Sequence, residues 1–162
     1  MFKKYYEINI KKFIFLLFFL TISRLIPHEP NFTPIFSISV LGFLFFENIS
    51  TRVFLVLLSM FLSDIFLGFY SSMFFIYISI VLIIILSSQK SYLIMTPLAP
   101  IVFFIISNFG VWLNSDIYSK NIYGLLECYI MAIPFLKNLF ISTFFYTIII
   151  LLSRKFFLYK IF

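Results

Sequence analysis

Six apolar runs separated by short polar segments take up most of this 162-residue chain. The runs cover residues 13–26, 33–46, 53–69, 73–87, 91–113 and 135–153. Because 63% of the residues are hydrophobic and only 11% are charged, the chain has far more apolar side chain than a soluble domain of this length can bury. One helix crosses a bilayer in about 20 residues. The sequence therefore predicts an all-α, polytopic transmembrane bundle of six spans, a single integral membrane domain over residues 1–162 in contact with membrane lipid.

The first apolar run follows a basic N-terminal segment, as the apolar core of a signal peptide does. It lacks a small-x-small cleavage site and continues directly into Arg24 and Pro27. We therefore expect a retained first span. Pro27 and Pro30 should end this first helix, and Pro34 should start the second.

The distribution of Lys and Arg predicts an orientation. With six spans and a cytoplasmic N-terminus, the inner segments carry Lys3, Lys4, Lys11, Lys12, Arg52, Lys90, Arg154, Lys155 and Lys160, and the outer segments carry only Arg24, Lys120 and Lys137. Because cytoplasmic loops of membrane proteins are enriched in basic residues, both termini are predicted to be cytoplasmic. The net charge of +6 is scattered over segment ends rather than gathered in a stripe, so nucleic acid is not an expected partner.

Small residues and a polar linker complete the expected organisation. Residues 114–134 are too polar at their start to span a membrane, and we expect a loop that folds back onto the helix ends and turns at Gly124 and Pro134. Ser39 and Gly42 should allow close packing of the second helix, and Gly68 should allow close approach of the third.

This topology places the polar residues of the spans at one side of the membrane. Arg24 and His28 fall at the outer end of the first span, and Asn31 opens the second. By a rise of ~1.5 Å per residue, Asp64 lies roughly 17 Å from the inner end of the third span, in its outer half. Asn108 and Trp112 fall near the outer end of the fifth span, and Lys137 and Asn138 open the sixth. We therefore predict that these polar groups converge on the outer face.

Asp64 is the most informative single residue, because a carboxylate inside a span costs several kcal/mol unless it is paired, protonated or hydrated. It has two interpretations that the sequence leaves open. Asp64 is either part of a functional site or one half of a structural ion pair, with Arg24 or Lys137 as its partner.

The segment from 106 to 135 combines aromatic rings with amide and carboxylate groups, as a small-molecule pocket does. An aromatic belt at the membrane interface is the alternative interpretation of its Trp and Tyr residues. The full set of predicted ligand-binding residues is Arg24, His28, Asn31, Asp64, Asn108, Trp112, Asn114, Tyr118, Glu127, Tyr129, Lys137 and Asn138.

Several other chemistries are not expected from the sequence. Cys128 is the only cysteine and His28 the only histidine, so neither an internal disulfide nor a site with several imidazole or thiolate ligands for a metal can form. No motif indicates a cofactor, and no nucleophile-elbow pattern surrounds a serine. We therefore expect no enzyme activity and a packing role for Cys128.

The stretches RLIPHEPNFTPI, SDIFLG, SNFGVWL and GLLECYIMAIPF carry a family resemblance. They resemble an uncharacterised bacterial family of six-span integral membrane proteins, a domain of unknown function, over most of the chain. Glu29 replaces a proline of that family's pattern, and only Gly42 remains of a glycine pair. The architecture is also similar to the substrate-binding S components of energy-coupling-factor (ECF) transporters, which bind a ligand from outside and rely on a transmembrane coupling subunit and ATPases.

These observations predict a multi-pass protein of the bacterial cytoplasmic membrane that captures a small molecule on its outer face. The resemblance to S components implies a coupling subunit and ATPases as partners. Two alternatives stay open. One is a structural or assembly protein with interhelical polar networks, and the other is an intramembrane enzyme that uses His28 and Asp64.

Overall fold

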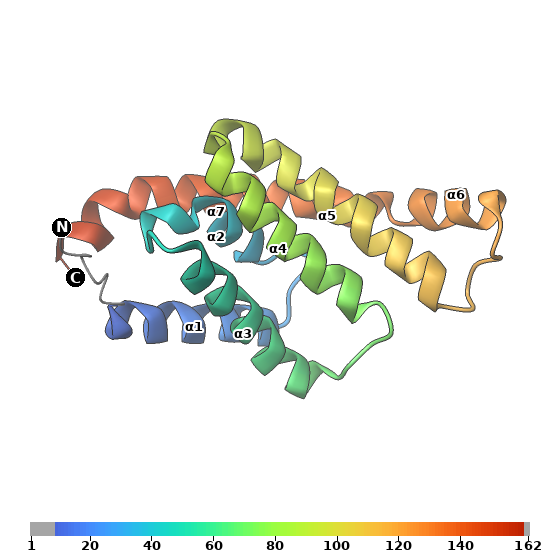
Figure 1. Cartoon of the computed structure of the whole chain (residues 1–162), viewed down its shortest axis with the longest axis horizontal. Coiled ribbons are helices and arrows are strands. Elements are labelled where there is room, and N and C mark those ends of the chain that lie inside the picture. The colour runs from blue at the N-terminus through green and yellow to red at the C-terminus, as the bar shows by residue number, and fades with distance from the viewer. Residues whose placement is uncertain (1–8, 161–162) are drawn as a thin grey trace, which may run out of the picture.

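The computed structural model describes residues 9–160, with side chains as far as residue 153. These residues form seven α-helices and one 3-10 turn, in the order α1 Ile10–Leu25, α2 Ile35–Leu41, η1 Gly42–Leu44, α3 Ile49–Leu67, α4 Met73–Gln89, α5 Tyr92–Asn114, α6 Ile122–Met131 and α7 Ile133–Lys160. The start of α1 and the end of α7 lie at the same end of the molecule, and α6 lies at the opposite end (Figure 1). The prediction of an all-α fold is confirmed.

Prolines and capping side chains set the helix ends near the predicted positions. Ile26 is extended (φ −69°, ψ 133°), as a residue before proline prefers, so α1 ends at Leu25. Pro34 is the N-cap of α2, which confirms that proline as its start. The Asn9 side chain accepts a hydrogen bond from the backbone N–H of Lys12 (3.1 Å) and caps α1.

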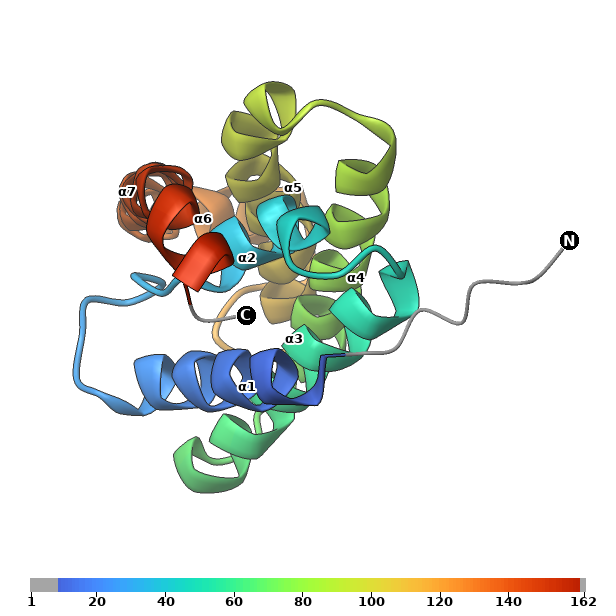
Figure 2. The same ribbon diagram turned by 90° about the vertical axis from the view of Figure 1, so that its left-hand side faces the viewer.

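The short helix α2 lies in the middle of the bundle. All seven of its residues are buried, and it contacts α3, α4, α5 and α7. Figure 2, which views the molecule along its long axis, shows α2 among these helices. The Ser37 hydroxyl donates to the backbone carbonyl of Thr143 in α7 (2.9 Å). Neighbouring helices bury the apolar side chains of α2. The helix therefore does not need to be long enough to cross a bilayer.

Among the residues that the structure describes, three helices are long and apolar enough to cross a membrane: Ile49–Leu67, Tyr92–Asn114 and Ile133–Ser153. The predicted number of six spans is not shown. The predicted span 33–46 is a seven-residue helix followed by η1, which is too short for a hydrocarbon core of ~30 Å. The helices α1 and α4 have 16 and 17 residues. Apolar composition alone could not separate a central buried helix from a spanning one.

The predicted loop over residues 114–134 is wrong in part, because residues 122–131 form α6, although the segment does fold back onto α5 and α7. The Asn121 side chain accepts from the backbone N–H of Gly124 (3.0 Å) and caps this helix. Gly124 therefore lies in its first turn rather than at a chain reversal. A Cβ added there would be 2.1 Å from the carbonyl oxygen of Ser119, so the position needs glycine for close approach. Ala132 separates α6 from α7, and Pro134 lies in the first turn of α7, where its missing N–H leaves no intrahelical bond unmade.

Close helix packing depends on Gly110 rather than on Gly68. Gly68 ends α3 with φ +93°, and a Cβ there would meet no atom within 4 Å, so the prediction that it allows helix approach is wrong. Gly110 instead brings α5 against α4, because its Cβ would lie 2.4 Å from Cγ of Phe75. Gly42 also has a close neighbour, since its Cβ would be 3.2 Å from Cδ of Arg52.

We predict that Gly110→Ala lowers the free energy of unfolding by about 1–3 kcal/mol, the usual cost of overpacking a tight contact. The added methyl group would overlap the base of the Phe75 ring, which cannot swing aside as a side-chain tip could. Thermal unfolding in a mild detergent measures the loss. Adding Phe75→Ala should recover part of it, and equal stability of Gly110→Ala and wild type would contradict the close contact.

Candidate functional site

An ion pair between α1 and α3 is the first feature of the site. Nη2 of Arg24 lies 2.7 Å from Oδ1 of Asp64, whose side chain is fully buried, whereas 15% of the Arg24 side chain is exposed. Nη1 of Arg24 donates to the carbonyl of Met60 (2.9 Å) and to the hydroxyl of Ser63 (2.5 Å). Arg24, one of the two partners considered for Asp64, is therefore the one that the structure pairs with it.

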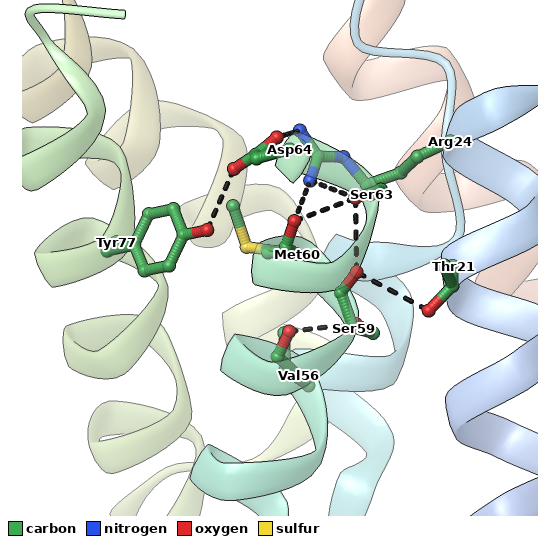
Figure 3. Close-up of polar contacts among 8 residues, drawn as sticks. All are labelled: Thr21, Arg24, Val56, Ser59, Met60, Ser63, Asp64 and Tyr77. Carbon is green, nitrogen blue, oxygen red and sulfur yellow. Dashed lines mark hydrogen bonds and ion pairs between the residues drawn. The ribbon is translucent and has the colours of Figure 1, made fainter. Parts of the chain in front are cut away.

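Tyr77 brings α4 into the same network. Its hydroxyl donates to Oδ2 of Asp64 (2.7 Å), so the two carboxylate oxygens face an arginine on one side and a tyrosine on the other (Figure 3). Thr21 in α1 extends the contact along α3, with its hydroxyl 3.4 Å from the carbonyl of Ser59. Three helices are thus joined around one carboxylate, and this arrangement satisfies a group that would otherwise be costly to bury.

A cavity opens beside this network, and we call it the Arg24 cavity. Its volume is about 280 Å³. The polar residues at its wall are Arg24, His28, Asn31, Thr33 and Tyr70. Apolar side chains, including Phe36, Ile76, Ile80 and Phe103, form the rest of the wall. Asp64 does not line this cavity and reaches it only through Arg24.

A second cavity, which we call the Asn108 cavity, lies among α5, α6, α7 and the loop before α2. Its volume is about 340 Å³. Ser107, Asn108, Tyr118 and Cys128 are among its lining residues, together with Phe104 and the corner between α6 and α7. The two cavities share three lining residues, Asn31, Ile76 and Phe103. They are therefore adjoining chambers on either side of one common wall.

Several polar groups at these walls keep hydrogen-bonding capacity. Asn31 has a left-handed backbone (φ 64°), and its carbonyl accepts from Ser142 (3.1 Å), while its side-chain amide has no partner within residues 9–153. Nδ2 of Asn108 donates to the carbonyl of Phe104 (2.8 Å), which leaves its Oδ1 available. Burial raises the pKa of the Tyr70 phenol and the Asp64 carboxylate raises it further, while the charge and hydrogen bond of Arg24 offset part of this rise, so the hydroxyl stays protonated and can donate.

Trp112 and Asn114 hold the loop after α5 rather than line either cavity. The indole N–H of Trp112 donates to the carbonyl of Ser119 (3.0 Å), and the Lys120 ammonium lies 5.9 Å from the centre of its ring. Lys120 also donates to the carbonyls of Trp112 and Ser115, at the C-terminal end of α5. Asn114 donates to the carbonyl of Ser71 (3.1 Å) and so joins α5 to the turn before α4.

The remaining predicted site residues lie outside both cavity walls. The Tyr129 hydroxyl donates to the carbonyl of Ile105 (2.6 Å) and fastens α6 to α5. Glu127 and Lys137 are exposed, and Asn138 is half-buried on α7. The structure thus brings Arg24, His28, Asn31, Asn108 and Tyr118 to the cavities, and these four residues line neither cavity.

Tyr70 and Tyr77 are site residues that the sequence analysis missed. A usable signal existed, because α3 and α4 form an antiparallel hairpin whose turn centres near residue 70. Residues equally far from that turn face each other, and Asp64 and Tyr77 lie at nearly equal distances from it. Phe103, the shared wall, had no comparable signal, because it resembles every other phenylalanine of the chain. No group of three metal-ligating side chains occurs within the part of the chain that the structure describes.

The fold and the site define a class: within the described residues, an all-helical, multi-pass membrane protein with three candidate spanning helices and a pair of mainly apolar cavities that each carry a few polar groups. The chain belongs to a family of unknown function, DUF6580, whose sequence pattern matches residues 6–160. This match covers nearly the whole chain and agrees with the resemblance to an uncharacterised family. Comparison with curated proteins found no match, and comparison with solved structures found none either.

Proposed function

We propose that this protein binds a small molecule at the outer face of the cytoplasmic membrane and serves as the substrate-binding part of an uptake system. The observation that carries the proposal is the pair of adjoining cavities with unused polar groups at their common wall. Their volumes, about 280 and 340 Å³, together fall in the range of ligand pockets, and apolar walls with a few placed polar groups are typical of such sites.

The proposed topology has six membrane-embedded helical segments, including the short α2, with both termini in the cytoplasm. The starts of α1 and α3 and the end of α4 lie toward one end of the bundle (Figure 1), and Lys11, Lys12, Arg52 and Lys90 lie at these helix ends. Arg24 and Leu67, near the other ends of α1 and α3, line the Arg24 cavity. The positive-inside rule then puts the cavities outside. The basic residues at 3, 4, 154, 155 and 160, which the same prediction uses, lie outside the described side chains.

A reporter that is active only outside the cytoplasm, fused after Ser115, tests this orientation. We expect high activity, because Ser115 follows the end of α5 at the cavity end of the bundle. A fusion after Lys90, at the opposite end, is the matched control and should be inactive. The reverse pattern would contradict the outward orientation of the cavities.

Uptake would need an external source of energy. The sequence has no G-x-x-x-x-G-K-[ST] motif for nucleotide phosphates. We therefore propose that a transmembrane coupling subunit and ATPases complete the system, as in ECF transporters, with an ion gradient as the alternative source. Purification in mild detergent without overexpression, followed by identification of associated chains, tests for these subunits.

Ligand recovery tests the binding function itself. Protein purified from membranes should carry a small molecule that mass spectrometry detects after extraction. We expect Asn108→Ala to reduce its recovery about tenfold or more, the loss that follows removal of one to two hydrogen bonds at a buried wall. Asn114→Ala is the matched control, because Asn114 lies in the same helix and lines neither cavity. Unchanged recovery in Asn108→Ala would place the ligand elsewhere.

A structural or assembly role is the second candidate, and the network around Asp64 favours it. The ion pair joins α1 and α3 and the tyrosine adds α4, as interhelical polar contacts do in membrane bundles. Folded, stable variants that never yield a ligand would support this role. An intramembrane enzyme using His28 and Asp64 has less support, because the ring of His28 lies against its own segment, 2.6 Å from the carbonyl of Ile26.

A further inference from the structure

We infer that the cavity pair selects an uncharged ligand, a ring-bearing molecule with a neutral hydrogen-bond acceptor, and that Asp64 is the residue that excludes anions. This inference rests on the proposed function and specifies its substrate class. It follows from the position of a fully buried carboxylate paired with Arg24, the one arginine within residues 9–153 that lines the cavity.

The first step concerns the donors of Arg24. A guanidinium has five N–H donors. The contacts to Met60, Ser63 and Asp64 occupy the Nη1 group and one side of Nη2. The Tyr70 hydroxyl is a further hydrogen-bond partner of Arg24. These four contacts leave at least one of the five N–H donors unused, and the Arg24 side chain lines the cavity and is 15% exposed. Arg24 can therefore still donate to an acceptor on a ligand.

The second step concerns charge. Asp64 already neutralises Arg24 at 2.7 Å and has no exposed surface, so its field is poorly screened by water. An anionic ligand at Arg24 would meet one positive and one negative charge close together, and it would gain little in exchange for its lost hydration. A neutral carbonyl or amide loses far less hydration and gains the same hydrogen bond. The pair thus favours an uncharged acceptor.

The other polar groups at the two walls add no compensating fixed positive charge. His28 is the only further titratable cation among the residues lining the Arg24 cavity, and it is exposed at the edge of the bundle. Tyr70, Asn31 and Asn108 are neutral donors or acceptors, and no lysine among residues 9–153 lines either cavity. The ligand that fits these groups is hydrogen-bonded rather than ion-paired.

The third step concerns the body of the ligand. Phe36 and Phe103 meet edge to face, with ring centres 4.7 Å apart, and Phe104 lines the neighbouring chamber. With Ile76 they form walls that suit a flat apolar ring. A ring packed on the common wall at Phe103 lies in the chamber lined by Arg24 or in the chamber lined by Asn108.

A charge series of three probes tests the inference on the purified full chain. The probes are 1-naphthaleneacetamide, 1-naphthaleneacetate and 1-naphthylethylammonium, which share a ring and differ in head-group charge. We expect wild type to bind the amide at least about tenfold more tightly than either ion, a difference of about 1.4 kcal/mol. Asp64→Asn keeps the size of the side chain and an acceptor for Tyr77 but removes the charge. It should improve binding of the acetate by about tenfold or more, because Arg24 then lacks a counterion.

The double variant Arg24→Gln/Asp64→Asn is the matched control, and it should lose that gain in acetate affinity. If Asp64→Asn does not fold, the ranking of the three probes by wild type decides the question. Tighter binding of the acetate than of the amide by wild type would overturn the inference and leave the proposed binding function standing. No binding of any probe would contradict both the cavity as a ligand site and the inference.

Discussion

Asp64→Ala is expected to lower the free energy of unfolding by about 3–5 kcal/mol, the usual cost of removing one partner of a buried ion pair. The variant leaves the Arg24 guanidinium with no counterion at a position where 15% of the side chain is exposed. It also removes the acceptor of the Tyr77 hydroxyl. Equilibrium unfolding in a mild detergent measures the change.

Replacing both charged partners separates the ion pair from the packing around it. Arg24→Met/Asp64→Leu should recover most of the stability that Asp64→Ala loses, because neither charge then remains buried alone. A loss below about 1 kcal/mol for Asp64→Ala, the value typical of exposed pairs, would show that water reaches this carboxylate. The structural importance of the pair would then be contradicted.

Phe103→Ala is expected to have the second largest effect, a loss of about 3 kcal/mol in the free energy of unfolding. This value is the lower end of the range measured for truncating a buried phenylalanine in soluble proteins. In a membrane the unfolded side chain meets lipid rather than water, so the variant loses packing contacts but little hydrophobic transfer energy. Phe103 is 7% exposed and packs edge to face on Phe36. The variant also joins the two cavities into one chamber.

Phe104→Ala is the matched control for this prediction. Phe104 is only half-buried and lines one cavity, so its removal should cost about 1 kcal/mol, near the average for a point substitution. The same unfolding measurement compares the two. Equal losses for the two variants would contradict the position of Phe103 as the wall between two chambers.

The sequence predicted those helix ends that lie next to a proline. The end of α1 before Pro27 and the start of α2 at Pro34 follow from local backbone restrictions, and the structure confirms both. The extent of α2 did not follow, because a seven-residue helix enclosed by four others is as apolar as a spanning one. In such an apolar sequence, residues buried by other helices cannot be distinguished from residues that face lipid.

The loop expected before α7 shows a second limit. Gly124 and Pro134 indicate a chain reversal when they are considered alone. The structure uses the glycine for close approach to Ser119 and the proline for a helix start. The sequence did contain a signal for this helix start, because Asn121 is a favoured N-cap residue. Its side chain accepts from the N–H of Gly124, the third residue of the helix.

The candidate site was predictable where charge requires a partner. A carboxylate within an apolar helix must find a donor, and Arg24 was one of two cations at a compatible depth. The aromatic walls were not predictable. The chain has 26 phenylalanines, and only the packing in the folded structure distinguishes Phe103 from the others. Trp112 and Tyr129 resembled ligand-binding residues, but they fasten a loop and a helix through main-chain carbonyls.

A cysteine at the cavity end of the bundle tests most directly whether the cavities face the outside of the cell. Asp116 is exposed in the loop after α5, whereas Cys128 is buried and burial raises the pKa of its thiol, so Cys128 itself reacts slowly. In a Cys128→Ser background, Asp116→Cys should be modified by a membrane-impermeant methanethiosulfonate added to intact cells, and Cys128→Ser alone should stay unlabelled. Modification of Asp116→Cys only in inverted membrane vesicles would contradict an outward-facing site.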